Sequence, residues 1–208
     1  MFKASDLMQP TLHRRAFTRA GWIFESKVDG FRCLIIKGRG KVSLISRQGK
    51  PLTATFPELV AGLARLENHS VLDAELVVPD EAGKPSFERT LQRSRMSDPD
   101  AIAVAARTLP ASLVVFDVMT AYGADVRESP LMARKEQLAD LLPVSTAIQL
   151  ASYTAEHGEA AYALAIQHGG EGIVGKDATS TYRAGRQATW LKIKNPDFYR
   201  KEALGIRG

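Results

Sequence analysis

The chain has 208 residues, of which 45% are hydrophobic and 25% charged, and its formal net charge is +5 at pH 7. This composition is typical of a globular protein with a sizeable core. No apolar run reaches the length of a membrane span and the N-terminus lacks the apolar core of a signal peptide, so we expect a cytoplasmic protein with no membrane association.

Short apolar segments bounded by turn residues recur along the chain and predict β-strands. The first is expected to end before the turn at Asp29 and Gly30, which places Lys27 at a strand end. Cys33 is the only cysteine, so it excludes an intramolecular disulfide, and we interpret it as a small strand residue with no chemical role. The predicted strands cover residues 22–25, 33–36, 42–45, 71–78, 113–118, 148–150, 173–174 and 190–193.

Helical periodicity appears in three stretches between these strands. The first helix is predicted to begin at Pro57 and to place three leucines on one face. The second covers residues 133–142, and the third is capped by Thr154 and runs to about His168. Residues 94–99 are predicted to form a loop. Short strands mixed with helices, without a regular βαβ repeat, predict an α+β fold.

The chain shows no internal repeat and no linker, which predicts a single domain over residues 1–208. We interpret residues 1–20 as an N-terminal lead-in and residues 195–208 as a C-terminal tail.

Positive charge is concentrated near the C-terminus. Residues 176–208 contain eight Lys or Arg and three Asp or Glu, and their net charge of +5 equals that of the whole chain. Such a segment suits the phosphates of a nucleotide or of a nucleic-acid backbone. Lys192 and Lys194 alternate with apolar residues and therefore share one face of the predicted strand. The cations that follow are expected to be solvated: Arg200, Lys201 and Arg207.

The segment Lys27-Val28-Asp29-Gly30 places a lysine beside a glycine turn, with Arg32 on the strand that follows. An amine attacks phosphorus only when neutral, and an ordinary lysine is almost entirely charged near neutral pH. Partial burial and a neighbouring cation both favour the neutral amine, so Lys27 is a candidate nucleophile. Taken alone, the segment fits a hairpin with surface charges equally well. Asp29 fits a turn residue and a supporting catalytic residue equally well.

Further short motifs follow Lys27 in order. They are Ser46-Arg47-Gln48-Gly49, Leu72-Asp73-Ala74-Glu75-Leu76, Val115-Phe116-Asp117-Val118, Glu171-Gly172-Ile173-Val174-Gly175-Lys176, Tyr182-Arg183-Ala184-Gly185-Arg186 and Trp190-Leu191-Lys192-Ile193-Lys194. With Lys27 they resemble the covalent nucleotidyltransferases, which include ATP-dependent DNA ligases, RNA ligases and mRNA capping enzymes. The resemblance runs from about Trp22 to Lys194 and is strongest to the adenylation domain of bacterial end-joining ATP-dependent DNA ligases.

The resemblance implies two antiparallel sheets packed with helices, with the nucleotide between the sheets. It also implies that Lys27 attacks the α-phosphate of ATP, expels pyrophosphate and carries AMP as a phosphoramidate. The AMP then passes to the 5′-phosphate of nicked or broken DNA, and a 3′-hydroxyl displaces it to seal the strand. ATP and Mg²⁺ or Mn²⁺ are the implied cofactors.

Two carboxylates are candidates for the metal. Glu75 and Glu171 each lie beside apolar strand residues, where an unpaired carboxylate is costly and a hard cation would offset the cost. By the resemblance, Glu75 binds the ribose and reaches the metal, while Glu171 helps to hold it. We interpret the neighbouring Asp73 and Asp117 as structural residues that satisfy backbone donors.

The resemblance also assigns residues to the base, ribose and phosphates. Glu25 would help to read adenine, and Phe116 would stack on it, although a lone phenylalanine in an apolar strand is ordinarily a core residue. Arg32 and Arg47 would contact ribose or phosphate. The phosphate-binding lysines would be Lys192 and Lys194, for which a basic edge strand is the alternative interpretation.

The end of the chain departs from the usual pattern of these ligases, which continue into an oligonucleotide-binding barrel with a further basic motif. The residues after Lys194 number about fourteen and are too few for a five-stranded barrel. We expect no barrel in this chain, and we expect DNA binding to involve a separate oligonucleotide-binding domain or a repair partner. A monomer is expected. An excised domain fits, and so does a natural protein that depends on a partner or works slowly.

Two other functions remain open at this point. An RNA ligase or a capping-type guanylyltransferase would use the same covalent chemistry. A nucleotide-binding module without turnover would keep the pocket but would have no need of the nucleophile.

Overall fold

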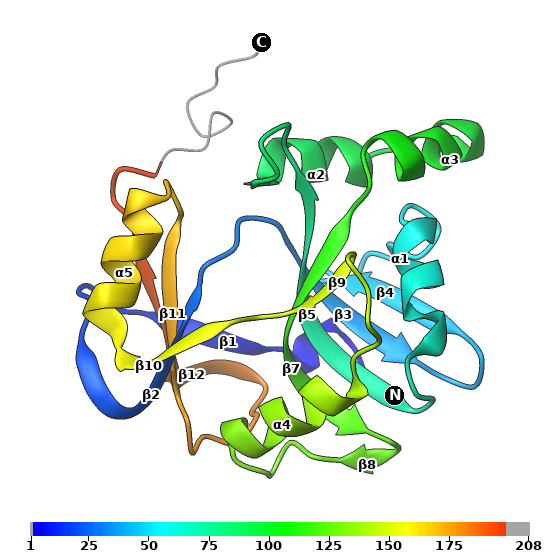
Figure 1. Ribbon diagram of the computed structural model, residues 1–208. Coiled ribbons are helices and arrows are strands. Elements are labelled where there is room, and N and C mark those ends of the chain that lie inside the picture. The colour runs from blue at the N-terminus through cyan, green and yellow to red at the C-terminus, as the bar shows by residue number, and fades with distance from the viewer. Residues whose placement is uncertain (1, 199–208) are drawn as a thin grey trace.

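Alternating apolar residues form two β-sheets in the computed structural model, which describes residues 2–198 (Figure 1). The larger sheet has seven strands in the order β4-β3-β5-β7-β8, with β6 paired to β5 and β9 paired to β7. Its strands are β3 (Phe31–Lys37), β4 (Val42–Ser46), β5 (Ser70–Pro79), β6 (Pro85–Ser86), β7 (Ser112–Ala121), β8 (Ala124–Asp125) and β9 (Ile148–Leu150).

The smaller sheet has five strands in the order β1-β12-β11-β2-β10. Strands from both ends of the described chain therefore lie side by side, since β1 pairs in parallel with β12. The strands are β1 (Met8–Leu12), β2 (Thr18–Ser26), β10 (Tyr153–His157), β11 (Gly172–Asp177) and β12 (Gly185–Lys194).

Within residues 2–198, five α-helices cover these sheets, with α5 on the smaller sheet and the others around the larger one (Figure 1). Helix α4 packs on β7, α2 packs on β5, and α5 packs on β2 and β11. Their bounds are α1 (Pro57–Gly62), α2 (Phe87–Ser94), α3 (Pro99–Thr108), α4 (Leu131–Leu141) and α5 (Gly158–Gln167), with 3₁₀ turns at η1 (Ala4–Asp6) and η2 (Leu63–Arg65). Within the described residues, no helix is long and apolar enough to cross a bilayer.

A small apolar core lies between the two sheets and joins them. Its smaller-sheet side includes Met8 and Trp190, and its larger-sheet side includes Leu34 and Met119; all four are buried. Phe116 of β7 packs against this core and is itself partly exposed. The floor of the space between the sheets is therefore apolar and closely packed.

Strands β2 and β3 belong to different sheets, so the chain from Lys27 to Gly30 crosses from one sheet to the other (Figure 1). This crossover presses against β5. A Cβ atom at Gly30 would collide with the Leu76 carbonyl oxygen and lie 2.7 Å from Val77 Cγ1. Only glycine lets the crossover approach β5 this closely, because it has no side chain. The structure therefore excludes the simple hairpin that the segment alone allowed.

The predicted α+β fold with two sheets is confirmed, and each of the eight predicted strands is present. Two pairings, β1 with β12 and β7 with β9, are parallel rather than antiparallel. The helix cap predicted at Thr154 is wrong, because residues 153–157 form β10, antiparallel to β2, and α5 begins at Gly158. The loop predicted at residues 94–99 is found at residues 95–98, between α2 and α3, because Ser94 ends α2 and Pro99 begins α3.

The predicted lead-in, residues 1–20, contributes β1 and the start of β2 to the smaller sheet. Most of the predicted tail, residues 199–208, lies outside the described residues, as do the cations expected to be solvated there: Arg200, Lys201 and Arg207.

Candidate functional site

Lys27 directly follows β2, and its amine faces the acidic residue that precedes β11. Lys27 Nζ lies 2.6 Å from Glu171 Oε2, and Lys194 Nζ of β12 lies 3.6 Å from Glu171 Oε1. The Glu171 side chain is only 5% exposed, whereas Lys27 is 20% exposed. A buried carboxylate shared by two lysines therefore fixes Lys27 at the mouth of the space between the sheets.

Two cavities meet at Lys27. The first has a volume of about 110 Å³ and a mainly apolar wall that includes Val114, Phe116, Val174 and Trp190. Its size and apolar walls suit a flat ring more than a charged group.

The second cavity is larger and cationic, with a volume of about 470 Å³. Six cationic side chains and two carboxylates line it, so its wall carries a clear excess of positive charge. An excess of fixed cations concentrates and orients phosphate groups. These charged residues are Lys27, Arg32, Arg47, Glu75, Glu171, Arg186, Lys192 and Lys194.

The two cavities share Lys27, Arg32 and Glu75 in their walls. A ligand with a flat apolar part and a polyanionic part would therefore pass Lys27 at the junction between them. The two parts of the site match the two parts of a nucleoside triphosphate.

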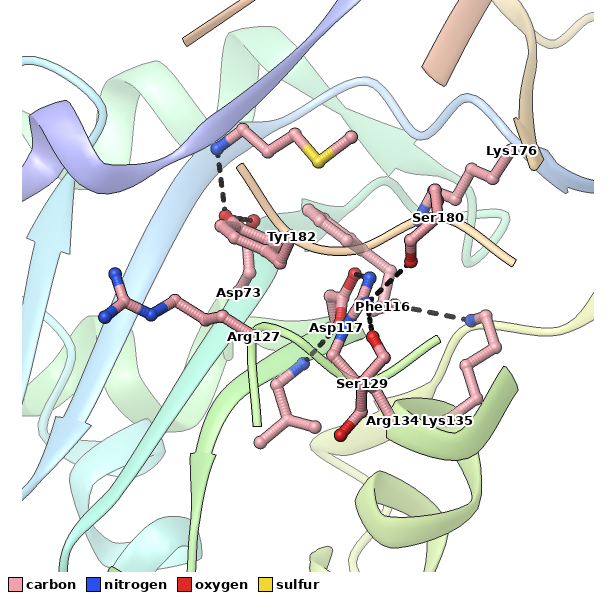
Figure 2. A network of polar contacts seen from close by, with 12 residues as sticks. Asp73, Phe116, Asp117, Arg127, Ser129, Arg134, Lys135, Lys176, Ser180 and Tyr182 are labelled. Atoms are coloured by element: carbon pink, nitrogen blue, oxygen red, sulfur yellow. Dashed lines mark hydrogen bonds and ion pairs between the residues drawn. The ribbon is translucent and has the colours of Figure 1, made fainter. Parts of the chain in front are cut away.

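Arg32 of β3 is held by Asp73 of β5, with two nitrogen–oxygen distances of 2.6 Å. Tyr182 donates its hydroxyl to the same carboxylate at 2.6 Å and accepts the backbone N–H of Met8 at 3.0 Å (Figure 2). Burial and the adjacent carboxylate raise the pKa of the Tyr182 hydroxyl well above its usual value, so it remains a donor. Arg32 is thus fixed with its guanidinium carbon 4.8 Å from the centre of the Phe116 ring.

Glu25 of β2 is buried between two lysines. Lys135 Nζ of α4 lies 2.5 Å from its Oε1, and Lys176 Nζ of β11 lies 2.6 Å from its Oε2. Lys176 also lies 4.5 Å from the Phe116 ring centre and 4.1 Å from that of Trp190. The pKa of Lys176 is lowered to about 8, mainly by burial; Glu25 opposes this shift and Lys135 contributes to it. The wall of the apolar cavity is therefore charged at one place, where Glu25 and Lys176 line it.

Glu75 of β5 lines both cavities near Arg32. Burial raises the pKa of its carboxyl to about 7, although the charges of Arg32 and Lys27 act in the opposite direction. The protein alone does not fully stabilise the ionised form of Glu75, which is the behaviour expected of a carboxylate that lacks a cation.

Asp73 and Asp117 are both fully buried, but the expectation that they satisfy backbone donors holds only for Asp117, because the hydrogen bonds described for Asp73 come from the side chains of Arg32 and Tyr182. Asp117 of β7 binds Arg134 of α4 at 2.8 and 2.9 Å, and it accepts only one backbone N–H, from Val118. Figure 2 shows that Arg134 also donates to the backbone carbonyls of Ser129 and Ser180, at 2.6 and 2.8 Å.

The cations predicted to bind phosphate lie around the larger cavity. Lys192 and Lys194 of β12 both line it, and so does Arg47, whose guanidinium donates to Gln9 Oε1 at 3.1 Å. Burial, followed by the charges of Lys194 and Arg186, lowers the pKa of Lys192. Mutual repulsion among these cations would be relieved by a bound polyanion.

Four residues of the site were not predicted from the sequence: Lys135, Lys176, Arg186 and Trp190. Three of them lie inside segments quoted as motifs, where no role was assigned to them. Lys135 lies on α4, outside every motif, and its position is set by the packing of α4 on β7. No local pattern in the sequence could have placed it beside Glu25.

The chain matches the family described as ATP dependent DNA ligase domain over residues 3–194. It belongs to this family of ATP-dependent DNA ligase domains. The Bacillus subtilis (strain 168) bifunctional non-homologous end joining protein LigD is 32% identical over 207 residues, which cover 90% of this chain and 34% of the relative. The Mycobacterium tuberculosis H37Rv LigD, a multifunctional non-homologous end joining DNA repair protein, is 33% identical over 176 residues, which cover 84% of this chain and 22% of the relative.

Solved structures agree with this assignment of family and fold. A mycobacterial DNA ligase D complexed with ATP and MES superposes with a TM-score of 0.75 at 30% identity, covering 94% of this chain and 62% of that one. The bacteriophage T7 ATP-dependent DNA ligase in complex with ATP, at 18% identity, has the same fold, with a TM-score of 0.67 and coverage of 93% and 69%. The chain spans about a third or less of the length of the two LigD relatives.

Proposed function

We propose that this domain forms a covalent AMP intermediate on Lys27 and passes the AMP to the 5′-phosphate of nicked or broken DNA, which a 3′-hydroxyl then seals. One observation carries the proposal: the amine of Lys27 lies where an apolar cavity meets a cationic one. Adenine would occupy the first cavity and the phosphates the second, which brings the α-phosphate to the nucleophile.

The first step forms a bond between Lys27 Nζ and the α-phosphorus and breaks the bond to the bridging oxygen of pyrophosphate. The amine must lose a proton before it attacks, and Glu171 Oε2, 2.6 Å from the amine, is within reach to accept it. Lys194, which also lies near Glu171, and Lys192 would stabilise the negative charge that develops on the phosphate oxygens.

A divalent cation fits the two carboxylates of the larger cavity. Within the described residues, no group of three or more His, Cys, Asp or Glu could hold a metal by itself. A Mg²⁺ site built from one or two carboxylates and the substrate phosphates has no need of such a group. We propose that Glu75 and Glu171 hold Mg²⁺ or Mn²⁺, which would supply countercharge to the triphosphate.

Removal of divalent metal is expected to stop AMP transfer to Lys27. The Glu75→Gln variant is expected to bind the metal–nucleotide complex more weakly than the wild type does. The reason is that the raised pKa of Glu75 marks a carboxylate whose ionised form needs a cation. Binding of the metal–nucleotide should therefore release a proton near pH 7 in the wild type but not in the variant. Calorimetry in two buffers of different ionisation enthalpy measures this release. Normal AMP transfer in EDTA would contradict the metal assignment.

Phe116→Ala is expected to weaken ATP binding by about 1–3 kcal/mol if adenine stacks on the ring. The ring lines the apolar cavity and is partly exposed there, so it can contact a ligand. It also packs on the core between the sheets, and the substitution will therefore lower stability as well. Calorimetric affinity should be measured well below the melting temperature of the variant. Unchanged affinity in a folded variant would exclude stacking.

Two other members of the covalent nucleotidyltransferase group are less well supported. An RNA ligase or a capping-type enzyme would share Lys27, but the family match and the LigD relatives favour a DNA ligase domain. A binding module without turnover would not need a lysine at the junction of the two cavities.

The proposed function is tested by following labelled AMP from the protein to DNA. The protein is labelled with [α-³²P]ATP and Mg²⁺, freed of nucleotide, and mixed with a DNA duplex whose nick has a 5′-phosphate and a 3′-dideoxy end, so that sealing cannot release the AMP. Movement of the label from protein to the DNA 5′ end supports the proposal, and retention of the label with DNA but transfer to an RNA nick would favour an RNA ligase.

A further inference from the structure

Tyr182 is a buried residue that lines neither of the two cavities at Lys27. Its side chain belongs to a residue that is only 2% exposed, and its ring packs edge-on against Trp190, with the ring centres 5.8 Å apart. Its hydroxyl donates to Asp73 Oδ2 at 2.6 Å and accepts the Met8 N–H at 3.0 Å (Figure 2). The hydroxyl therefore joins β1 of the smaller sheet to β5 of the larger one.

The same two residues hold the guanidinium of Arg32. Its Nη2 donates to Asp73 Oδ2 at 2.6 Å and to the Met8 carbonyl at 2.7 Å. Its Nε donates to Asp73 Oδ1 at 2.6 Å. Within residues 2–198, every acceptor of this guanidinium therefore belongs to Asp73 or Met8, and the Tyr182 hydroxyl bonds to both of these residues.

One nitrogen of Arg32 remains for a ligand. A guanidinium has five N–H donors, and Arg32 uses three of them on Asp73 and Met8. Among the described residues, the two hydrogens of Nη1 have no acceptor, and Arg32 lines both cavities. Because the guanidinium is planar, the bonds that Nε and Nη2 make also set the direction of Nη1.

A second carboxylate lies within reach of Arg32. Asp73 and Glu75 are two residues apart on β5 and therefore lie on the same face of the sheet, and Glu75 is the register partner of Arg32 on β3. The described ion pair of Arg32 is nevertheless with Asp73. Without the Tyr182 hydroxyl, the Asp73 carboxylate would be free to turn and the guanidinium free to shift toward Glu75.

We propose that Tyr182 is a positioning residue for the transfer of AMP to Lys27, because its hydroxyl holds Asp73 and Met8 in the places from which they aim Arg32 at the cavities. This inference rests on the proposed formation of a covalent AMP intermediate. Tyr182 itself touches neither the nucleotide nor the reacting atoms. A misplacement of about 1 Å in a group that positions a substrate can lower a rate about 100-fold, so the loss of one hydroxyl is expected to be measurable.

The test compares Tyr182→Phe with a matched control, Thr90→Val, in the 208-residue chain. The Thr90 hydroxyl of α2 is also buried, accepts the Val78 N–H at 2.9 Å and donates to the Ser86 carbonyl at 2.7 Å, outside both cavities. Covalent labelling is followed over a range of ATP concentrations, together with melting curves. The second-order rate constant for labelling is expected to fall at least about tenfold in Tyr182→Phe and less than about twofold in Thr90→Val.

A double-mutant cycle separates positioning from a general loss of stability. Arg32→Lys keeps a cation beside Asp73 but has no Nη1 to be aimed. If Tyr182 acts through Arg32, adding Tyr182→Phe to Arg32→Lys should change labelling less than about twofold. Recurrence of the full fall in this background would show that the effect does not pass through Arg32, and it overturns the inference. If Arg32→Lys labels too slowly to measure, the comparison with Thr90→Val decides alone.

A fall of less than about tenfold in folded Tyr182→Phe, or an equal fall in Thr90→Val, overturns the inference. A wild type that acquires no label overturns the proposed function, and the inference with it. If Tyr182→Phe does not melt cooperatively, Asp73→Asn tests the same link, because an amide offers one oxygen where Arg32 uses two. A fall of at least about tenfold in that variant supports the inference, and a smaller fall overturns it.

Discussion

Replacing Lys27 with alanine is expected to abolish covalent AMP while leaving the chain folded. Residue 27 follows β2 and is partly exposed, so the substitution opens no core cavity. Lys194 remains near Glu171 and keeps that buried carboxylate close to a cation. Lys27→Arg is expected to fail as well, because a guanidinium is not neutral at any working pH and cannot attack phosphorus. Labelling with α-labelled ATP, followed by denaturing gel electrophoresis, measures the loss.

Lys41→Ala is the matched control for this experiment, because Lys41 is an exposed lysine that does not line either nucleotide cavity. It should label like the wild type. Covalent AMP on a folded Lys27→Ala protein would show that another residue is the nucleophile.

The largest expected loss of stability follows from breaking the ion pair between Asp117 and Arg134, both of which are fully buried. Asp117→Ala leaves the guanidinium of Arg134 buried without its carboxylate, and it removes the acceptor of the Val118 N–H. We expect the free energy of unfolding to fall by about 3–5 kcal/mol. Urea unfolding followed by circular dichroism measures this change.

Asp125→Ala provides the comparison, because Asp125 and Arg127 form the same kind of pair at the surface, with side chains 51% and 38% exposed. Solvent screens that pair, so its loss should cost only about 0–1 kcal/mol. Equal effects of the two substitutions would show that burial does not set the strength of the Asp117 pair.

The strands were predictable because their signal is local. Continuous or alternating apolar residues, such as those of β5 and β7, report burial on the faces of a sheet directly. Which strands share a sheet depends on contacts between distant segments. The assignment of β2 and β3 to different sheets, which turns the segment at Lys27 into a crossover, was therefore not predictable from the sequence pattern.

Helix α2 was missed because its buried face is polar. Thr90 and Arg93 are fully buried there, with the Arg93 guanidinium 2.7 Å from Glu58 Oε1, so the helix shows no apolar stripe. Strand β10 was missed because all five of its residues are exposed, so no alternation of buried and exposed positions marks it as a strand. Helix α3 was not predicted either, although the sequence contains a signal for its start. Asp98 is a favoured capping residue, and its side chain accepts the Ala101 N–H.

In the candidate site, too, some residues could be predicted from motifs and others are placed only by the fold. Motif residues that are far apart in the chain, such as Lys27, Glu75, Glu171 and Lys194, line one cavity. Lys135 reaches Glu25 only because α4 packs behind β7, and that contact is a property of the fold rather than of any motif.

The most direct test of the account is to locate AMP on the protein after incubation with ATP and Mg²⁺. Intact mass measurement is expected to show one AMP per chain, peptide mapping to place it on Lys27, and added pyrophosphate to remove it. A folded chain that carries AMP on another residue, or that acquires none, would contradict the assignment of Lys27 as the nucleophile.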